Sequence, residues 1–141
     1  MLGSILTLVT LTEARAGEDP WTLIAGVEYR EIIEGNDWRV EKTLPPPLLE
    51  AAKRPFTVSG YYVPIEAQAY VTNFLLVPDP ENCPFCGSSG IGILLEVFAS
   101  EPMPDLPEGT EVTLTGTLEI VDDPFTYQAV KLVDARPVSK N

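Results

Sequence analysis

The sequence predicts a mainly β protein: a small five-stranded, OB-like Greek-key barrel with an N-terminal extension made of a β-hairpin and a short helix. Five short β-rich segments follow one another between Phe56 and Asp134. Fourteen prolines in 141 residues favour short strands and turns over long helices. Gly60 and Gly116 lie inside two of the segments, as is typical of strands that bend in small barrels. A small open β-sandwich is the alternative.

The chain divides into three parts: a signal peptide at residues 1–16, the extension at 17–54 and the barrel at 55–138. Met1–Leu11 is apolar and is followed by Ala14-Arg15-Ala16, which matches the small-x-small cleavage pattern of exported proteins. The apolar run is too short to span a bilayer. We therefore expect an exported protein, periplasmic or extracellular, with no transmembrane segment once the leader is removed. No Lys or Arg precedes the apolar run. A frayed first strand is the alternative, since Thr7, Thr10 and Thr12 suit β structure.

The extension begins with a predicted hairpin. Leu23–Ile33 and Trp38–Leu44 are β-rich, and Glu34–Asp37 between them is a strong turn signal. Pro45–Pro47 predicts a stiff polyproline spacer. Leu48–Lys53 is the best helix candidate, because its residues favour helix and Pro55 stops it.

The barrel strands are expected in segments that alternate with turns. Thr110–Val121 is the clearest of them, because Val112, Leu114, Gly116, Leu118 and Ile120 fall on one face and polar residues on the other. The proline-rich stretch Glu101–Gly109 is expected to be a loop. The predicted strands are Phe56–Ile65, Tyr70–Val77, Ile91–Ala99, Thr110–Val121 and Tyr127–Asp134.

The charge pattern excludes several functions. The net charge is −12, and no Lys or Arg lies between Pro55 and Val130, a stretch that carries eleven acidic residues. A nucleic-acid groove needs cations that replace counterions along the phosphates, so we expect no nucleic-acid partner. The chain has no histidine, which excludes Ser-His-Asp and Cys-His catalysis and every zinc site that uses histidine. No catalytic residue is predicted.

The two cysteines, Cys83 and Cys86, share one loop and are the candidate site residues. In an exported protein two lone cysteines are expected to pair, so we expect a Cys83–Cys86 disulfide first and no cofactor. The second hypothesis is half of a zinc or iron knuckle, completed by carboxylates or by a second copy across a dimer. A thiol-redox role comes last, since Gly87-Ser88-Ser89-Gly90 does not favour a helix start and the neighbouring Asp79 and Glu81 would raise a thiol pKa.

Several short motifs in the barrel resemble a known family. They are VSGYYVPIE, NFLLVPDPENCPFCGSSG, ILLEVF and EVTLTGTLEI, which together span a little over half of the chain. They resemble the exported bacterial proteins grouped as DUF3299, including a branch with a CxxCG loop. The resemblance implies an exported OB-like domain of uncharacterised function. The single Cys followed by His that is common in that group is replaced here by two cysteines and Gly-Ser-Ser-Gly.

These observations predict a non-enzymatic exported binding or accessory module. We expect its partner to be a protein or peptide, bound at exposed strand edges and at the loops of one end of the barrel, including Pro78–Gly90. The alternatives are a metal-binding protein that uses Cys83 and Cys86, and a thiol-redox protein. A hydrolase built on Asp122 and Asp123 is the least favoured, because adjacent acids at a strand end usually cap a turn.

Overall fold

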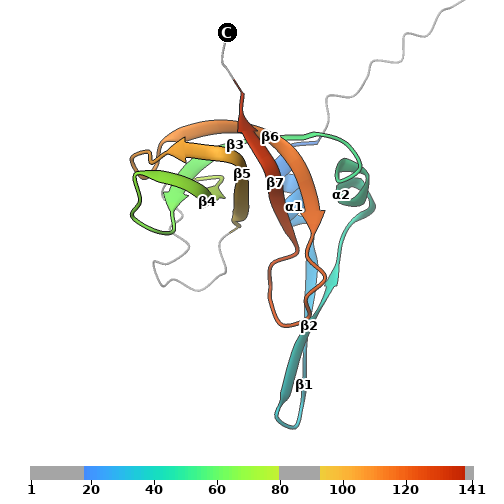
Figure 1. The fold of residues 1–141 in the computed structure, drawn as a ribbon. Helices are drawn as coiled ribbons and strands as arrows, with labels where there is room; N and C mark the ends of the chain where they lie inside the picture. The colour runs from blue at the N-terminus through green and yellow to red at the C-terminus, as the bar shows by residue number, and fades with distance from the viewer. Residues whose placement is uncertain (1–17, 80–92, 139–141) are drawn as a thin grey trace, which may run out of the picture.

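The computed structural model describes residues 18–79 and 93–138, which form a closed five-stranded barrel with an N-terminal β-hairpin and two short helices (Figure 1). This confirms the predicted fold class. The elements, in chain order, are α1 Pro20–Ala25, β1 Glu28–Glu34, β2 Asp37–Thr43, α2 Pro46–Ala51, β3 Phe56–Pro64, β4 Tyr70–Val77, β5 Leu95–Pro104, β6 Glu111–Ile120 and β7 Val130–Pro137.

The barrel strands are arranged in the order β3-β4-β5-β7-β6, and pairing of β3 with β6 closes the ring. β5 and β7 run parallel, whereas the other four neighbouring pairs are antiparallel. A parallel pair needs a crossover connection, and here β6 lies between β5 and β7 in the sequence but beside β7 in space. This Greek-key arrangement is the one expected of a small OB-like barrel.

The core fills the barrel with side chains from every strand. Tyr62 and Phe74 pack together there with ring centroids 5.1 Å apart, and the Tyr62 hydroxyl donates to Asp105 Oδ1 at 2.6 Å. Among the described residues, the largest side chains that are almost fully enclosed are Tyr62, Phe74, Leu48, Leu76, Leu95, Leu114, Leu132, Val58 and Val97. Leu48 belongs to α2, so the extension contributes to the same core as the barrel.

β6 follows the predicted alternation except at its end. Leu114 and Leu118 are buried, and Val112 packs against the core, as expected. Ile120, which is predicted to share that face, is 44% exposed and lines a surface hollow beside α2. The prediction is wrong there because the barrel interior ends before the strand does.

Several predicted boundaries need correction. The last strand is Val130–Pro137 and not Tyr127–Asp134, and the helix predicted to reach Lys53 ends at Ala51. Residues 23–25, expected in a strand, belong to α1, where Asp19 caps the helix by accepting from Thr22 N at 3.1 Å. Pro46 and Pro47, expected in a polyproline spacer, form the first turn of α2, where their missing N–H groups cost nothing. β5 continues to Pro104, through residues expected to be a loop, because prolines are tolerated at strand ends and edges.

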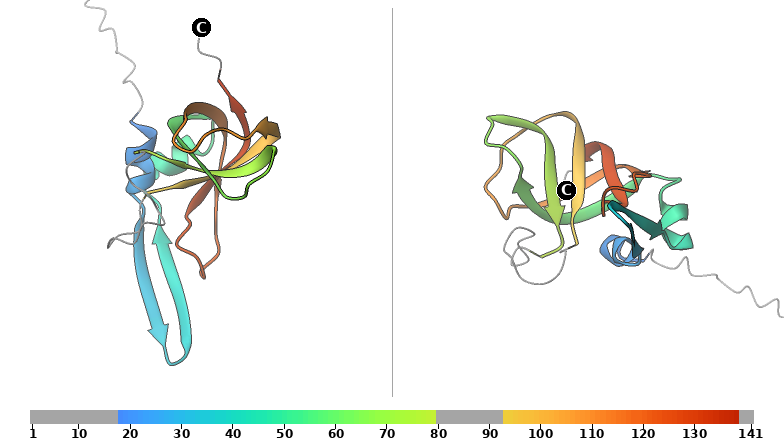
Figure 2. Two further views of the ribbon diagram at one scale, coloured as in Figure 1. Left: turned by 90° about the vertical axis from the view of Figure 1, so that its left-hand side faces the viewer. Right: turned by 90° about the horizontal axis from the view of Figure 1, so that it is seen from below.

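The predicted hairpin is present, although its first strand starts later than expected. β1 and β2 pair antiparallel from Glu28↔Thr43 to Glu34↔Asp37. The connecting Gly35 has a φ of 62°, which glycine adopts at no steric cost. The hairpin projects from the barrel (Figure 2).

The extension is attached to the barrel mainly through α1 and α2. Leu23, Ile24 and Val27 are buried in the main core, and Trp21 Nε1 donates to Ser59 O on β3 at 2.7 Å. Within residues 18–79 and 93–138, no helix is long and apolar enough to cross a membrane.

Candidate binding cleft

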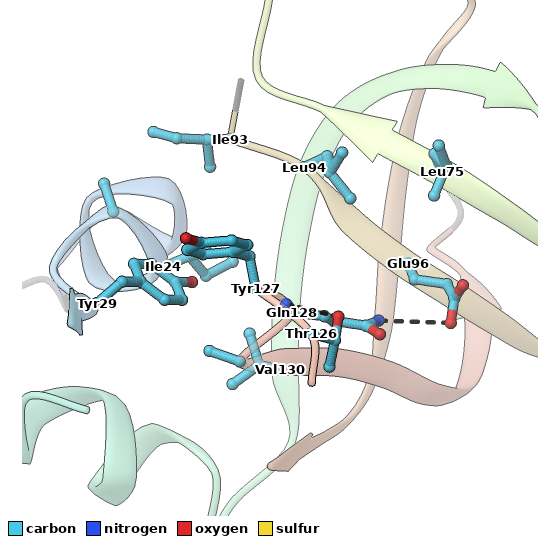
Figure 3. Close-up of a pocket in the computed structure, with 12 residues that line it drawn as sticks. Ile24, Tyr29, Leu75, Ile93, Leu94, Glu96, Thr126, Tyr127, Gln128 and Val130 are labelled. Carbon is cyan, nitrogen blue, oxygen red and sulfur yellow. Dashed lines mark hydrogen bonds between the residues drawn. The ribbon is translucent and has the colours of Figure 1, made fainter. Parts of the chain in front are cut away.

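A cleft of about 480 Å³ opens where the extension meets the barrel. Its walls come from α1, the base of β1, one residue of β4, β5 with the two residues before it, and the β6–β7 connection with the first residue of β7 (Figure 3). Its volume lies within the range of ~300–1,000 Å³ that is usual for ligand pockets. The lining residues are Ile24, Ala25, Tyr29, Leu75, Ile93, Leu94, Glu96, Thr126, Tyr127, Gln128, Ala129 and Val130.

Apolar side chains form most of the cleft. Leu75, Ile93 and Leu94 lie on the barrel side, and Ile24 lies on the opposite side below the ring of Tyr127. Leu94 also packs against a cluster on the outside of the sheet, formed by Val63, Leu75 and Val77 with Tyr61. The cleft is therefore a continuation of packed apolar structure, and its shape is fixed by residues that are themselves held in place.

Glu96 and Gln128 form a hydrogen-bonded polar pair on one wall of the cleft, and the hydroxyl groups of Tyr29, Thr126 and Tyr127 belong to other lining residues. Gln128 Nε2 donates to Glu96 Oε1 at 3.4 Å, and Gln128 N donates to Thr126 Oγ1 at 3.1 Å (Figure 3). The long contact between Gln128 and Glu96 links the β6–β7 connection to β5 and leaves the carboxylate with further acceptor capacity. None of the lining residues is Lys or Arg. The cleft thus offers a negative charge beside an apolar surface.

The hairpin holds the β6–β7 connection in position. Val40 N donates to Pro124 O at 2.7 Å. Lys42 Nζ donates to two carbonyls of the connection, Val121 O at 3.2 Å and Gln128 O at 2.5 Å. Burial lowers the pKa of Lys42, while the carboxylates of Asp123 and Asp122 oppose this shift. The connection that lines the cleft is therefore bound to β2 at both of its ends.

Three aromatic rings extend the contact between the hairpin and the β6–β7 connection. Tyr127 lies between Tyr29 and Trp38, with ring centroids 5.7 Å away in each case and the rings tilted. Trp38 Nε1 donates to Glu31 Oε1. Burial, together with the charge and hydrogen bonding of Glu31, raises the pKa of Tyr127. Tyr29, Trp38 and Tyr127 thus join the hairpin face to the mouth of the cleft, with one carboxylate among them.

The predicted site residues have mixed outcomes. Cys83 and Cys86 lie outside the described residues, as does most of the Pro78–Gly90 loop, so their disulfide, metal and redox roles stay predictions. Asp122 and Asp123 follow β6, where Asp123 Oδ1 accepts from Phe125 N at 2.9 Å within a turn. In the part of the chain that the structure describes, no group of three or more Cys, Asp or Glu is placed to hold a metal ion.

Sequence reasoning did not identify the cleft. Its lining comes from four separate stretches of the chain, and no motif joins them. One signal was present: Phe125-Thr126-Tyr127 places two aromatics directly after an Asp-Asp-Pro turn, which is unusual for a solvent-exposed connection. The residues that hold this connection, Val40 and Lys42, lie more than seventy residues away in the sequence.

Comparisons with known proteins add no further assignment: no family model matches the chain, and neither a curated protein nor a solved structure does so.

Proposed function

We propose that the protein is a non-enzymatic, exported binding or accessory module, and that the cleft between α1, β5 and the β6–β7 connection is its binding site. The observation that carries this proposal is a cleft of about 480 Å³ whose walls are mostly apolar and which contains the hydrogen-bonded pair Glu96 and Gln128. A few polar groups in an apolar concave site are the usual composition of a ligand pocket.

The ligand class that fits is a peptide segment with an apolar side chain next to a basic residue. Leu75, Ile93 and Leu94 would contact the apolar side chain, and Glu96 would accept from the basic one. The overall charge of −12 supports a basic partner, because it attracts cations over distances comparable to the Debye length. The same charge argues against an oligonucleotide, although OB-folds often bind them at their strand 2–3 face.

Export is part of this proposal and rests on the apolar Met1–Leu11 and the Ala14-Arg15-Ala16 motif. The short motifs that resemble the DUF3299 proteins point to the same compartment. Sequencing the N-terminus of protein secreted with its native leader tests it. We expect the mature protein to start at Gly17. If the protein recovered outside the cells still began with Met1, export with cleavage of the leader would be contradicted.

Peptide binding tests the cleft. A library of apolar–basic peptides is screened, and the best binder is titrated calorimetrically against wild type, Ala25→Trp and Ala67→Trp. Ala25 is an exposed residue that lines the cleft, whereas Ala67 is an exposed residue between β3 and β4 that does not. We expect Ala25→Trp to weaken binding at least tenfold and Ala67→Trp to leave it unchanged.

The charge of the cleft needs its own variant. Glu96→Gln keeps the shape of the side chain and removes the carboxylate. We expect Glu96→Gln to weaken binding of the apolar–basic peptide. A second peptide, in which Gln replaces the basic residue, should bind wild type more weakly and should bind Glu96→Gln with the same affinity as wild type. Binding that is unaffected by both Ala25→Trp and Glu96→Gln would place the peptide site elsewhere.

A further inference from the structure

The outer edge of β1 lacks a partner among the described residues. β1 pairs with β2 on one side, and no backbone hydrogen bond joins the described residues to its other edge. Figures 1 and 2 show the hairpin projecting beyond the barrel, with β2 on the side of the β6–β7 connection. A two-stranded hairpin is marginally stable in water, and a free edge strand is a template for another strand.

The register of the hairpin determines which backbone groups this edge offers. Val40 N–H points away from β1, since it donates to Pro124 O. Successive residues of a strand direct their N–H and C=O groups to opposite edges, so those of Arg39 and Glu41 point toward β1. Their partners in β1, Ile32 and Arg30, use their backbone groups within the hairpin. The groups of Tyr29, Glu31 and Ile33 therefore lie on the free edge.

We propose that β1 pairs antiparallel with β1 of a second copy of the chain, about a two-fold axis that passes beside Ile32. In this register Ile32 lies opposite the partner's Ile32, as a pair without hydrogen bonds whose side chains are close together. Glu31 and the partner's Ile33 exchange backbone hydrogen bonds, and the symmetry repeats this pair. The two hairpins then form one four-stranded sheet.

Charge favours this register over the neighbouring ones. An axis at Ile32 places Arg30 opposite the partner's Glu34 and repeats that ion pair by symmetry. An axis at Glu31 would place Glu31 opposite the partner's Glu31 and Glu28 opposite the partner's Glu34. An axis at Arg30 would place two guanidinium groups together. An axis at Ile33 would place Ile32 opposite the partner's Glu34 and would form no ion pair between the two β1 strands. Like charges directly across a ladder are unfavourable, and opposite charges are favourable.

The second copy also supplies a cationic partner for Glu34 at the end of the hairpin. Glu34 lies directly opposite Asp37, a like-charged pair, and its contact with Arg39 is at 3.5 Å between exposed side chains. The partner's Arg30 would lie on the other side of Glu34 in the same row of the sheet. Ile33, which is 67% exposed, would gain the partner's strand as a neighbour. The interface is small, so we expect association in the micromolar range or weaker.

A charge-reversal pair of variants tests this register, with the full chain in sedimentation velocity over a concentration series. Wild type is expected to show a reversible monomer–dimer equilibrium that weakens as salt is raised. Arg30→Glu alone places a carboxylate opposite the partner's Glu34, and Glu34→Arg alone places a guanidinium opposite the partner's Arg30, so each variant is expected to be monomeric. An equimolar mixture of the two variants restores both opposite-charge pairs and is expected to dimerise.

A backbone variant distinguishes the hydrogen bonds of the β1 edge from the contacts of its side chains. Ile33→Pro removes an N–H that the β1–β2 ladder does not use, and prolines are tolerated on edge strands. We expect it to abolish the dimer and to keep the circular dichroism spectrum, whereas Ile33→Val keeps both. A wild type that is monomeric up to about 1 mM, a mixture that stays monomeric, or a dimer that survives Ile33→Pro would each overturn the proposal. The proposal does not depend on what the cleft binds.

Discussion

Gly60 shows how closely the extension and the barrel approach each other. A Cβ at this position would lie 2.8 Å from both Leu76 Cγ and Val77 O, and 2.9 Å from Trp21 Cζ2. Real Cβ atoms do not come this close to backbone oxygens, so a side chain would force the strands or the indole to move. The glycine is thus required where β3, β4 and Trp21 meet, and this is a property of the packing, not of a turn.

We predict that Gly60→Ala lowers the free energy of unfolding by about 1–3 kcal/mol, the usual cost of overpacking a core. Urea denaturation measures it. Gly26→Ala is the matched control, because the nearest atoms to its Cβ would be Pro45 Cγ at 3.2 Å and Leu23 O at 3.3 Å, both farther away than the contacts of Gly60, and its φ of −74° suits alanine. Equal stability losses in the two variants would contradict the role assigned to Gly60.

Tyr62 gives a prediction for alkaline pH. Burial and its hydrogen bond to Asp105 raise the pKa of Tyr62 to about 12. Between pH 10 and 12 the unfolded chain loses this proton while the folded chain keeps it. The contribution of Tyr62 to the free energy of unfolding is therefore fully present below pH 10 and is lost as the pH rises toward 12. Tyr62→Phe is expected to cost about 1 kcal/mol at pH 7 through the lost hydrogen bond.

The measurement is the difference in unfolding free energy between wild type and Tyr62→Phe at pH 8, 10 and 11. Because the phenylalanine variant has no proton to lose at this position, the difference is expected to shrink as the pH rises. The other tyrosines and the lysines titrate in both proteins and cancel. A difference that stays constant up to pH 11 would show that the Tyr62 pKa is not raised.

Between elements, the contact that matters most for the cleft is that of β2 with the β6–β7 connection. A single amine, Lys42 Nζ, joins two carbonyls at opposite ends of this connection, and Val121 N donates back across it to Ala129 O at 2.8 Å. The hairpin is therefore part of the proposed binding site even though it is remote from the barrel core. It fixes the segment that carries Tyr127 and Gln128.

We predict that Lys42→Met loosens the β6–β7 connection and weakens ligand binding in the cleft. The methionine keeps most of the apolar stem and leaves two carbonyls without their donor, which is expected to cost about 1–2 kcal/mol. Hydrogen exchange at the Val121 amide is expected to accelerate. Lys53→Met is the control, because Lys53 is exposed and, within residues 18–79 and 93–138, its side chain pairs only with Glu50, so its effect should stay within about 0.5 kcal/mol. Unchanged exchange in Lys42→Met would contradict this account.

At the scale of the whole molecule, stability depends on one core that the barrel and the helices share. Leu114 on β6 is fully buried, while Ile120 on the same strand is 44% exposed. Both positions satisfy the same alternation in the sequence. The closed barrel distinguishes them, because only the first of the two points into the enclosed interior.

We predict that Leu114→Ala lowers the free energy of unfolding by about 2–5 kcal/mol and that Ile120→Ala changes it by less than about 1 kcal/mol. The larger loss combines the transfer term of the removed atoms with the cavity that they leave. Chemical denaturation of both variants under the same conditions provides the comparison. Similar losses in the two variants would mean that the interior extends to the end of β6.

By itself, the sequence determined the strands of the barrel, the hairpin and its turn, and the helix before β3. These follow from local alternation, turn chemistry and proline placement, which act over a few residues. It did not identify α1, because Leu23–Ala25 suggested the start of a β-rich run, and the Asp19 cap is the feature that marks the helix.

Tertiary structure alone decided which strands pair around the barrel, the exposure of Ile120 and the position of the cleft. Pairing of β3 with β6 and of β5 with β7 joins residues far apart in the sequence, and no local pattern specifies such pairs. The same holds for Lys42 and its two carbonyls, and for Tyr127 between Tyr29 and Trp38. The binding site proposed for this protein is made almost entirely of such long-range contacts, since a cleft forms where separate elements meet and not along any one of them.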